Sequence, residues 1–172
     1  MTDSTRRWAV RLRQGVAAAA ALGSLVSLSS CGGDVEAKVE QLEQERTAVR
    51  GWTTDLLTDL TEAKAGEVTW TGTEWPETDH EALREKATAH TYAVLVDLDV
   101  TSFDAVAAAW PDAVVDAPGQ SLHVEEGRRR ADFVLRDTKG RLTVTGRSVE
   151  IGVRDFAGSG LYDPDDDFPW PP

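Results

Sequence analysis

The chain is poor in cysteine, in histidine and in positive charge. It contains one cysteine and three histidines among 172 residues, and its 18 basic residues face 30 acidic ones, for a formal net charge of −12. One cysteine excludes an internal disulfide. The acidic balance argues against DNA or RNA as a partner, because such proteins need a basic surface to displace counterions.

Long apolar runs are also lacking. The longest one, Gly15–Leu28, is shorter than the roughly 20 residues of a transmembrane helix. Four arginines precede it: Arg6, Arg7, Arg11 and Arg13. The small residues Ser29 and Ser30 follow it and lead to the only cysteine, Cys31. This order is the layout of a secretory signal peptide.

The segment Leu28-Ser29-Ser30-Cys31 resembles the lipobox of a bacterial lipoprotein. In that family the cysteine becomes the first residue of the mature protein and carries a diacylglycerol and an amide-linked acyl chain such as palmitate. The resemblance covers residues 1–33 and implies a cleaved signal at 1–30, a lipidated tether at 31–33 and a place on the outer face of the cell membrane. It also implies that the only thiol is consumed, which excludes thioredoxin-like chemistry. An ordinary signal peptide or an uncleaved anchor are the alternatives.

The mature part has the size of one domain. Residues 1–30 carry a net charge of +3, so the remaining 142 residues carry about −15. The abundance of arginine over lysine, with many Ala, Val and Asp residues, is typical of a high-GC bacterium such as an actinobacterium. We expect a single α+β domain over residues 34–157 and a tail over 158–172.

A long amphipathic helix is predicted to open the domain. Apolar residues recur every seven positions: Val35, Leu42, Val49, Leu56 and Ala63. Asp34 is the expected N-cap, and Gly66 the residue that ends the helix. The apolar stripe either covers the sheet of its own domain or forms a coiled-coil seam with a partner. Polar residues at the alternate seam positions favour the first alternative.

Period-two alternation predicts the strands. Val68 and Trp70 share one face of the first strand, and a second strand runs through Tyr92–Val100. Short helices are expected from Asp79 and from Thr101, the latter ending before Pro111. Four further strands are expected at Leu122–Val124, Ala131–Arg136, Leu142–Val144 and Val149–Val153. This order predicts two layers, with the helices packed on a mostly antiparallel sheet.

The tail is rich in proline and aspartate, so we expect an extended strap or a disordered segment. Asp163, Asp165 and Asp167 have the spacing that opens a calcium loop, but the glycine and the distal glutamate of that loop are lacking. The three histidines (His80, His90 and His123) lack the spacing of zinc ligands. We therefore predict no metal and no cofactor.

Contact residues are expected at two places. Trp75 lies in a predicted loop, whereas Trp52, Trp70 and Trp110 fit the core. A basic cluster is formed by Arg128, Arg129 and Arg130. It either binds an acidic group of a ligand or partner, or is neutralised by Glu125 and Glu126.

Gly158-Ser159-Gly160 lacks the order of a nucleophile elbow, and no other set of residues indicates catalysis. The sequence therefore predicts a non-catalytic binding or accessory domain. Its ligand would be an envelope protein, a cell-wall component or a small molecule. The alternatives are an envelope hydrolase and a structural spacer that dimerises through its first helix.

Overall fold

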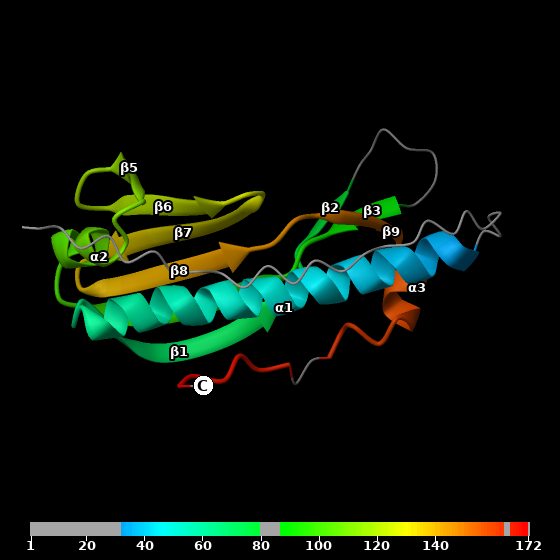
Figure 1. Ribbon diagram of the computed structural model, residues 1–172, viewed down its shortest axis with the longest axis horizontal. Coiled ribbons are helices and arrows are strands. Elements are labelled where there is room, and N and C mark those ends of the chain that lie inside the picture. The colour runs from blue at the N-terminus through cyan, green and yellow to red at the C-terminus, as the bar shows by residue number, and fades with distance from the viewer. Residues whose placement is uncertain (1–31, 80–86, 164–165, 172) are drawn as a thin grey trace, which may run out of the picture.

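The computed structural model describes residues 32–79, 87–163 and 166–171 (Figure 1). Its helices and strands, in chain order, are α1 Gly32–Glu62, β1 Gly66–Glu74, β2 Glu77–Asp79, β3 Ala87–His90, β4 Ala93–Val100, α2 Phe103–Ala109, β5 Val114–Ala117, β6 Ser121–Glu126, β7 Arg129–Arg136, β8 Lys139–Thr145, β9 Val149–Gly152 and α3 Val153–Gly158. Six strands form one antiparallel sheet in the order β1-β4-β8-β7-β6-β5, and three form a second in the order β2-β3-β9. The predicted α+β class with a mostly antiparallel sheet is confirmed.

The smaller sheet is the bent continuation of three strands of the larger one. β1 leads directly into β2, β3 leads into β4, and β8 leads into β9, so three neighbouring strands cross the bend together. Backbone hydrogen bonds continue through it, from Thr91 N to Pro76 O at 3.1 Å and from Gly146 N to Tyr92 O at 2.9 Å. The last strand does not pair with the strand before it in the chain, because β9 pairs with β3.

Helix α1 lies across both sheets and supplies much of the core. Leu42, Val49, Leu57 and Leu60 are completely buried on its inner face. The helix contacts β1, β4 and β8 of the larger sheet and β9 of the smaller one. The apolar stripe therefore covers the sheet of its own domain, as the sequence favoured.

The ends of α1 differ from the prediction. The helix begins at Gly32, so Gly32 and Gly33 are helical and do not form an extended tether. At the other end Lys64 adopts the left-handed conformation, with φ 54°. Lys64 N donates to Thr61 O, and Ala65 N donates to Leu60 O, both at 3.0 Å. This pair of bonds ends the helix at Glu62, four residues before Gly66, which begins β1.

Smaller corrections concern the short elements. Ser102, not Thr101, caps α2, because its Oγ accepts from Ala105 N at 3.1 Å. Val153 begins α3 and does not extend the last strand, and β5 is an additional strand. Asp79, the expected start of a helix, ends β2, and the rest of that predicted helix up to residue 86 lies outside the described residues.

Candidate functional site

The six-stranded sheet has one covered face and one open face. Helices α1 and α2 pack on the first, where Val94, Leu142 and Phe133 are completely buried. On the other face the described elements leave the side chains of β1, β4, β7 and β8 in contact with solvent. We call this second surface the open face.

The charges of the open face pair across neighbouring strands and, in one case, within a strand. Arg141 donates to Asp97 at 2.8 and 3.1 Å, and Lys139 bonds to Asp99. Further along the sheet, Arg130 Nε donates to Asp132 at 2.8 Å and His123 Nδ1 lies 2.9 Å from Asp116. Exposed pairs of this kind contribute little to stability. They do leave most of the charges of the open face paired.

Trp70 lies on the open face with 50% of its surface exposed. A β-bulge between Val68 and Trp70 puts it there, because Val68 pairs with inward-facing Leu98 while Trp70 pairs with outward-facing Asp97. The indole lies over Gly72, and a Cβ on that glycine would stand 2.5 Å from Trp70 Cη2. The prediction that Trp70 belongs to the core is therefore wrong.

Two hollows adjoin Trp70. The larger, of about 630 Å³, is lined on the open face by residues that include Asp97, Asp132, Arg141 and Thr143. The smaller, of about 450 Å³, lies at the edge strand β1 and is lined by Trp70, Trp170, Thr61, Glu67 and others. Thr69, the residue at the bulge, lines both hollows. The two hollows therefore adjoin at the bulge.

Trp75 has a different environment from the one predicted. Its ring packs against both hydrophobic clusters, with centroids 4.9 Å from Tyr92 and 5.5 Å from Phe156. Its Nε1 is buried and has no hydrogen-bond partner. Trp75 is thus a packing residue at the bend between the sheets and not an exposed loop residue.

The three arginines do not act as one cluster. Arg128 is exposed in the hairpin turn between β6 and β7. Arg129 turns to α1 and donates to Glu45 at 3.2 Å, whereas Arg130 lies on the open face. Glu126 lies 3.5 Å from Arg129, and Glu125 lies 3.3 Å from Arg130. The two glutamates thus pair with Arg129 and Arg130, as the second alternative of the sequence analysis has it.

The tail docks on the domain through Asp166. Arg46 and Arg50 donate to its carboxylate at 2.6 and 2.7 Å, and the Tyr92 hydroxyl donates at 3.3 Å. Burial raises the pKa of that Tyr92 hydroxyl above its ordinary value. Phe168, two residues on, is 3% exposed in the larger core. The described part of the tail is therefore an extended strap, which was one of the two expectations. The carboxylate of Asp166 holds this strap on α1 through Arg46 and Arg50.

His90 is the unusual polar residue of the interior. Its side chain is completely buried, neither ring nitrogen has a hydrogen-bond partner, and the ring stacks on Phe156 at 3.7 Å. Burial lowers its pKa below 6.5, although the carboxylate of Glu77, 3.9 Å from Nδ1, acts in the opposite direction. The folded protein therefore holds His90 neutral at neutral pH.

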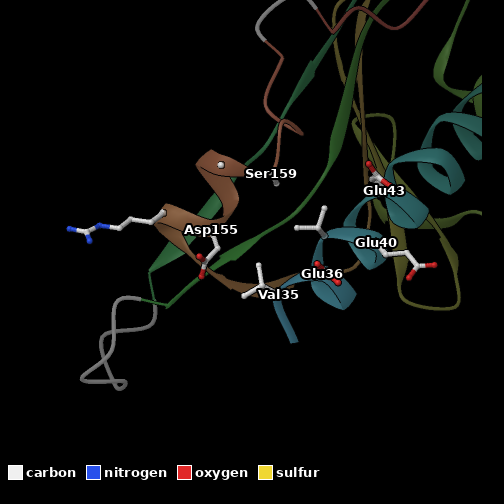
Figure 2. Close-up of a pocket in the computed structure, with 9 residues that line it drawn as sticks. Val35, Glu36, Glu40, Glu43, Asp155 and Ser159 are labelled. Atoms are coloured by element: carbon white, nitrogen blue, oxygen red, sulfur yellow. The ribbon is translucent and has the colours of Figure 1, made fainter. Parts of the chain in front are cut away.

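A shallow groove of about 450 Å³ separates the first turns of α1 from α3. Figure 2 shows Glu36, Glu40 and Glu43 of α1 on one side and Asp155 of α3 on the other. Arg154 is the basic residue of this lining. The groove is strongly acidic, but it contains no group of side chains arranged to hold a ligand.

Three remaining features lie partly or wholly outside the described chain. Cys31, His80 and Asp165 are not among the described residues, so their surroundings are not defined. Within the described ranges, no group of three or more His, Cys, Asp or Glu side chains is placed to hold a metal ion. Over the same ranges, no helix combines the length and the apolar character needed to span a membrane.

Comparisons with protein-family models, with curated proteins and with solved structures find no match for this chain. The open face, with its aromatic residue and two joined hollows, is therefore the candidate site on geometry alone. No sequence signal pointed to it, because the bulge that exposes Trp70 changes the alternation from which its position was predicted.

Proposed function

We propose that this chain is a lipoprotein of the bacterial cell envelope, held on the outer face of the cytoplasmic membrane by lipid on Cys31. Its domain is a non-catalytic binding or accessory module that uses the open face. The observation that carries the proposal is the lipobox-like segment that ends at Cys31, with α1 starting at the very next residue.

The fold suits an anchored binding module. Helix α1 has 31 residues and is therefore about 46 Å long. In Figure 1 its first turns lie beside α3 and β9, and its last turns lie beside α2 and the six-stranded sheet. An anchor at Cys31 would keep the three-stranded sheet near the membrane and present the open face of the six-stranded sheet at a distance from it. The acidic groove between α1 and α3 would then repel anionic lipid headgroups.

The alternative of a spacer that dimerises through α1 has less support. The apolar stripe that such a dimer would need is buried against the domain's own sheets. The alternative of a hydrolase is favoured by no specific observation in the described residues.

The anchor is tested by metabolic labelling of the full-length protein with an alkyne fatty acid in a bacterium that processes lipoproteins. We expect labelled protein in the membrane fraction for the wild type and for the control Ser30→Ala, which keeps a small residue before the cysteine. Cys31→Ala should remain unlabelled. Equal labelling of Cys31→Ala would overturn the proposal.

A further inference from the structure

Trp70 forms an exposed aromatic surface. The bulge turns its side chain outward, and the absence of a Cβ at Gly72 lets the indole approach the strand closely, while half of the residue's surface stays exposed. Bulges that re-aim a side chain, and glycines over which another group lies closely, are features found at functional sites. An exposed indole held in this way can stack on a flat, partly apolar ring.

A second tryptophan lies on the same surface. Trp170 is partly buried against the larger core and lines the smaller hollow together with Trp70. Thr61, Thr69 and Thr71 line that hollow too. Their hydroxyls donate to the backbone oxygens of Leu57, Asp97 and Phe168, so each can still accept a hydrogen bond from a ligand. Two aromatic rings and several hydroxyls along one surface suit an extended ligand made of repeated units.

The polar groups next to Trp70 are paired rather than free. Asp97 is the cross-strand neighbour of Trp70, and its carboxylate is held by the Arg141 guanidinium. The open face carries four basic and seven acidic residues: Arg130, Arg136, Lys139, Arg141, Glu67, Glu74, Asp97, Asp99, Asp116, Glu125 and Asp132. Eight of these eleven charges are paired with one another: Arg130, Lys139, Arg141, Asp97, Asp99, Asp116, Glu125 and Asp132. A surface whose charges are mostly paired attracts neither anionic nor cationic polymers strongly. It does offer fixed donors and acceptors to an uncharged ligand.

The apolar content of the open face is too dispersed for a protein interface. Val134 and Val114 are 43% and 55% exposed, but the β7 and β6 positions next to them on this face are polar. Protein interfaces have a contiguous apolar centre from which charges are depleted. Isolated aromatic platforms among fixed polar groups match the two kinds of surface on a sugar ring, its C–H face and its hydroxyls.

We propose that the open face and the adjoining β1 edge bind an uncharged oligosaccharide chain. Trp70 and Trp170 stack on sugar rings, and the Asp97–Arg141 pair and the threonines bond to hydroxyl groups. This inference depends on the binding function proposed above and adds the class of ligand.

The test uses the full-length protein, purified in a detergent without a sugar headgroup and titrated calorimetrically with maltotetraose, cellotetraose and tetra-N-acetylchitotetraose. We expect at least one of them to bind. Trp70→Ala should weaken that binding by about tenfold or more. Gly72→Ala should do the same although Trp70 is retained, since the new Cβ displaces the ring. Tyr162→Ala removes another exposed aromatic residue, 64% exposed, and should leave binding unchanged.

Two results would overturn the proposal that the ligand is a saccharide. One is that none of the three probes binds, and the other is that Trp70→Ala binds them as well as the wild type does, with both proteins folded by circular dichroism. A photoreactive residue placed at Thr143 in living cells then separates the two proposals. A discrete protein adduct would replace the saccharide by a protein partner and leave the binding function in place. Without binding and without an adduct, both proposals are wrong.

Discussion

The two ends of the molecule, the six-stranded sheet (the large end) and the three-stranded sheet (the small end), share three continuous strands but are not equally well packed. The larger cluster contains 20 buried residues and the smaller one contains five. At the large end the indole of Trp110 donates to Leu56 O at 3.0 Å, whereas at the small end Trp75 Nε1 and both nitrogens of His90 lack partners. Buried polar atoms without partners cost free energy. The large end is therefore the scaffold, and the small end should open first.

The strongest test of this difference compares two phenylalanines. Phe133→Ala at the large end removes a completely buried ring that packs edge-on against Trp110. We expect the free energy of unfolding to fall by about 3–5 kcal/mol, as measured by urea denaturation. Phe156→Ala, at the small end, should cost less, because the loss is limited to the free energy that holds that end closed.

Hydrogen exchange identifies where each variant opens. With Phe156→Ala, the amides of β3 and β9 should exchange faster while those of β7 and β8 keep their protection. With Phe133→Ala, protection should fall in both sheets. If Phe156→Ala lowered the protection of both sheets equally, the ends would be one cooperative unit and the comparison would be wrong.

A medium effect is expected where the tail reaches the large end. Asp166→Ala leaves Arg46 and Arg50 without their shared carboxylate, which is 6% exposed. Because both arginines keep some contact with solvent, we expect a loss of about 2 kcal/mol rather than the full cost of a broken buried pair. Thermal unfolding measures it. Asp167→Ala is the matched control, since its side chain is exposed and its backbone carbonyl, which accepts from Arg50, remains. Equal losses in the two variants would contradict the role given to the Asp166 carboxylate.

The sequence predicted local structure better than it predicted the bend. The stripe of α1, the alternation of β4 and the short helix α2 depend on neighbouring residues, and all three were predicted. The second sheet depends on distant contacts. At the bend, for example, a Cβ on Gly146 would stand 2.9 Å from Val49 Cγ2, on a helix almost a hundred residues away. No local pattern encodes such a close approach.

Trp70 and Trp75 show the same limit at the candidate site. Strict alternation predicts that Trp70 shares the face of Val68, in the core. The composition of its loop predicts that Trp75 is exposed. One inserted residue at the bulge reverses the first prediction, and the bend of the strands reverses the second. A tryptophan in the sequence indicates a possible contact residue. The face on which the Trp70 side chain lies, however, is set by the register of β1 with β4.

The smallest expected effect concerns pH and the small end alone. His90 is buried and its pKa is lowered in the folded state, so below its ordinary pKa of about 6.5 the unfolded chain binds the extra proton more readily. Stability is therefore complete well above that pH and falls as the pH decreases through about 6.5. His90→Leu should remove this fall from the exchange rates of β3 and β9. At pH 7 it should cost little, because the loss of the stacking on Phe156 is offset by the removal of two buried nitrogens that have no hydrogen-bond partner. Glu77→Gln, which removes the one nearby carboxylate at 3.9 Å, should make the fall steeper. An acid response in β7 and β8 that His90→Leu leaves unchanged would place the pH sensitivity at the large end instead.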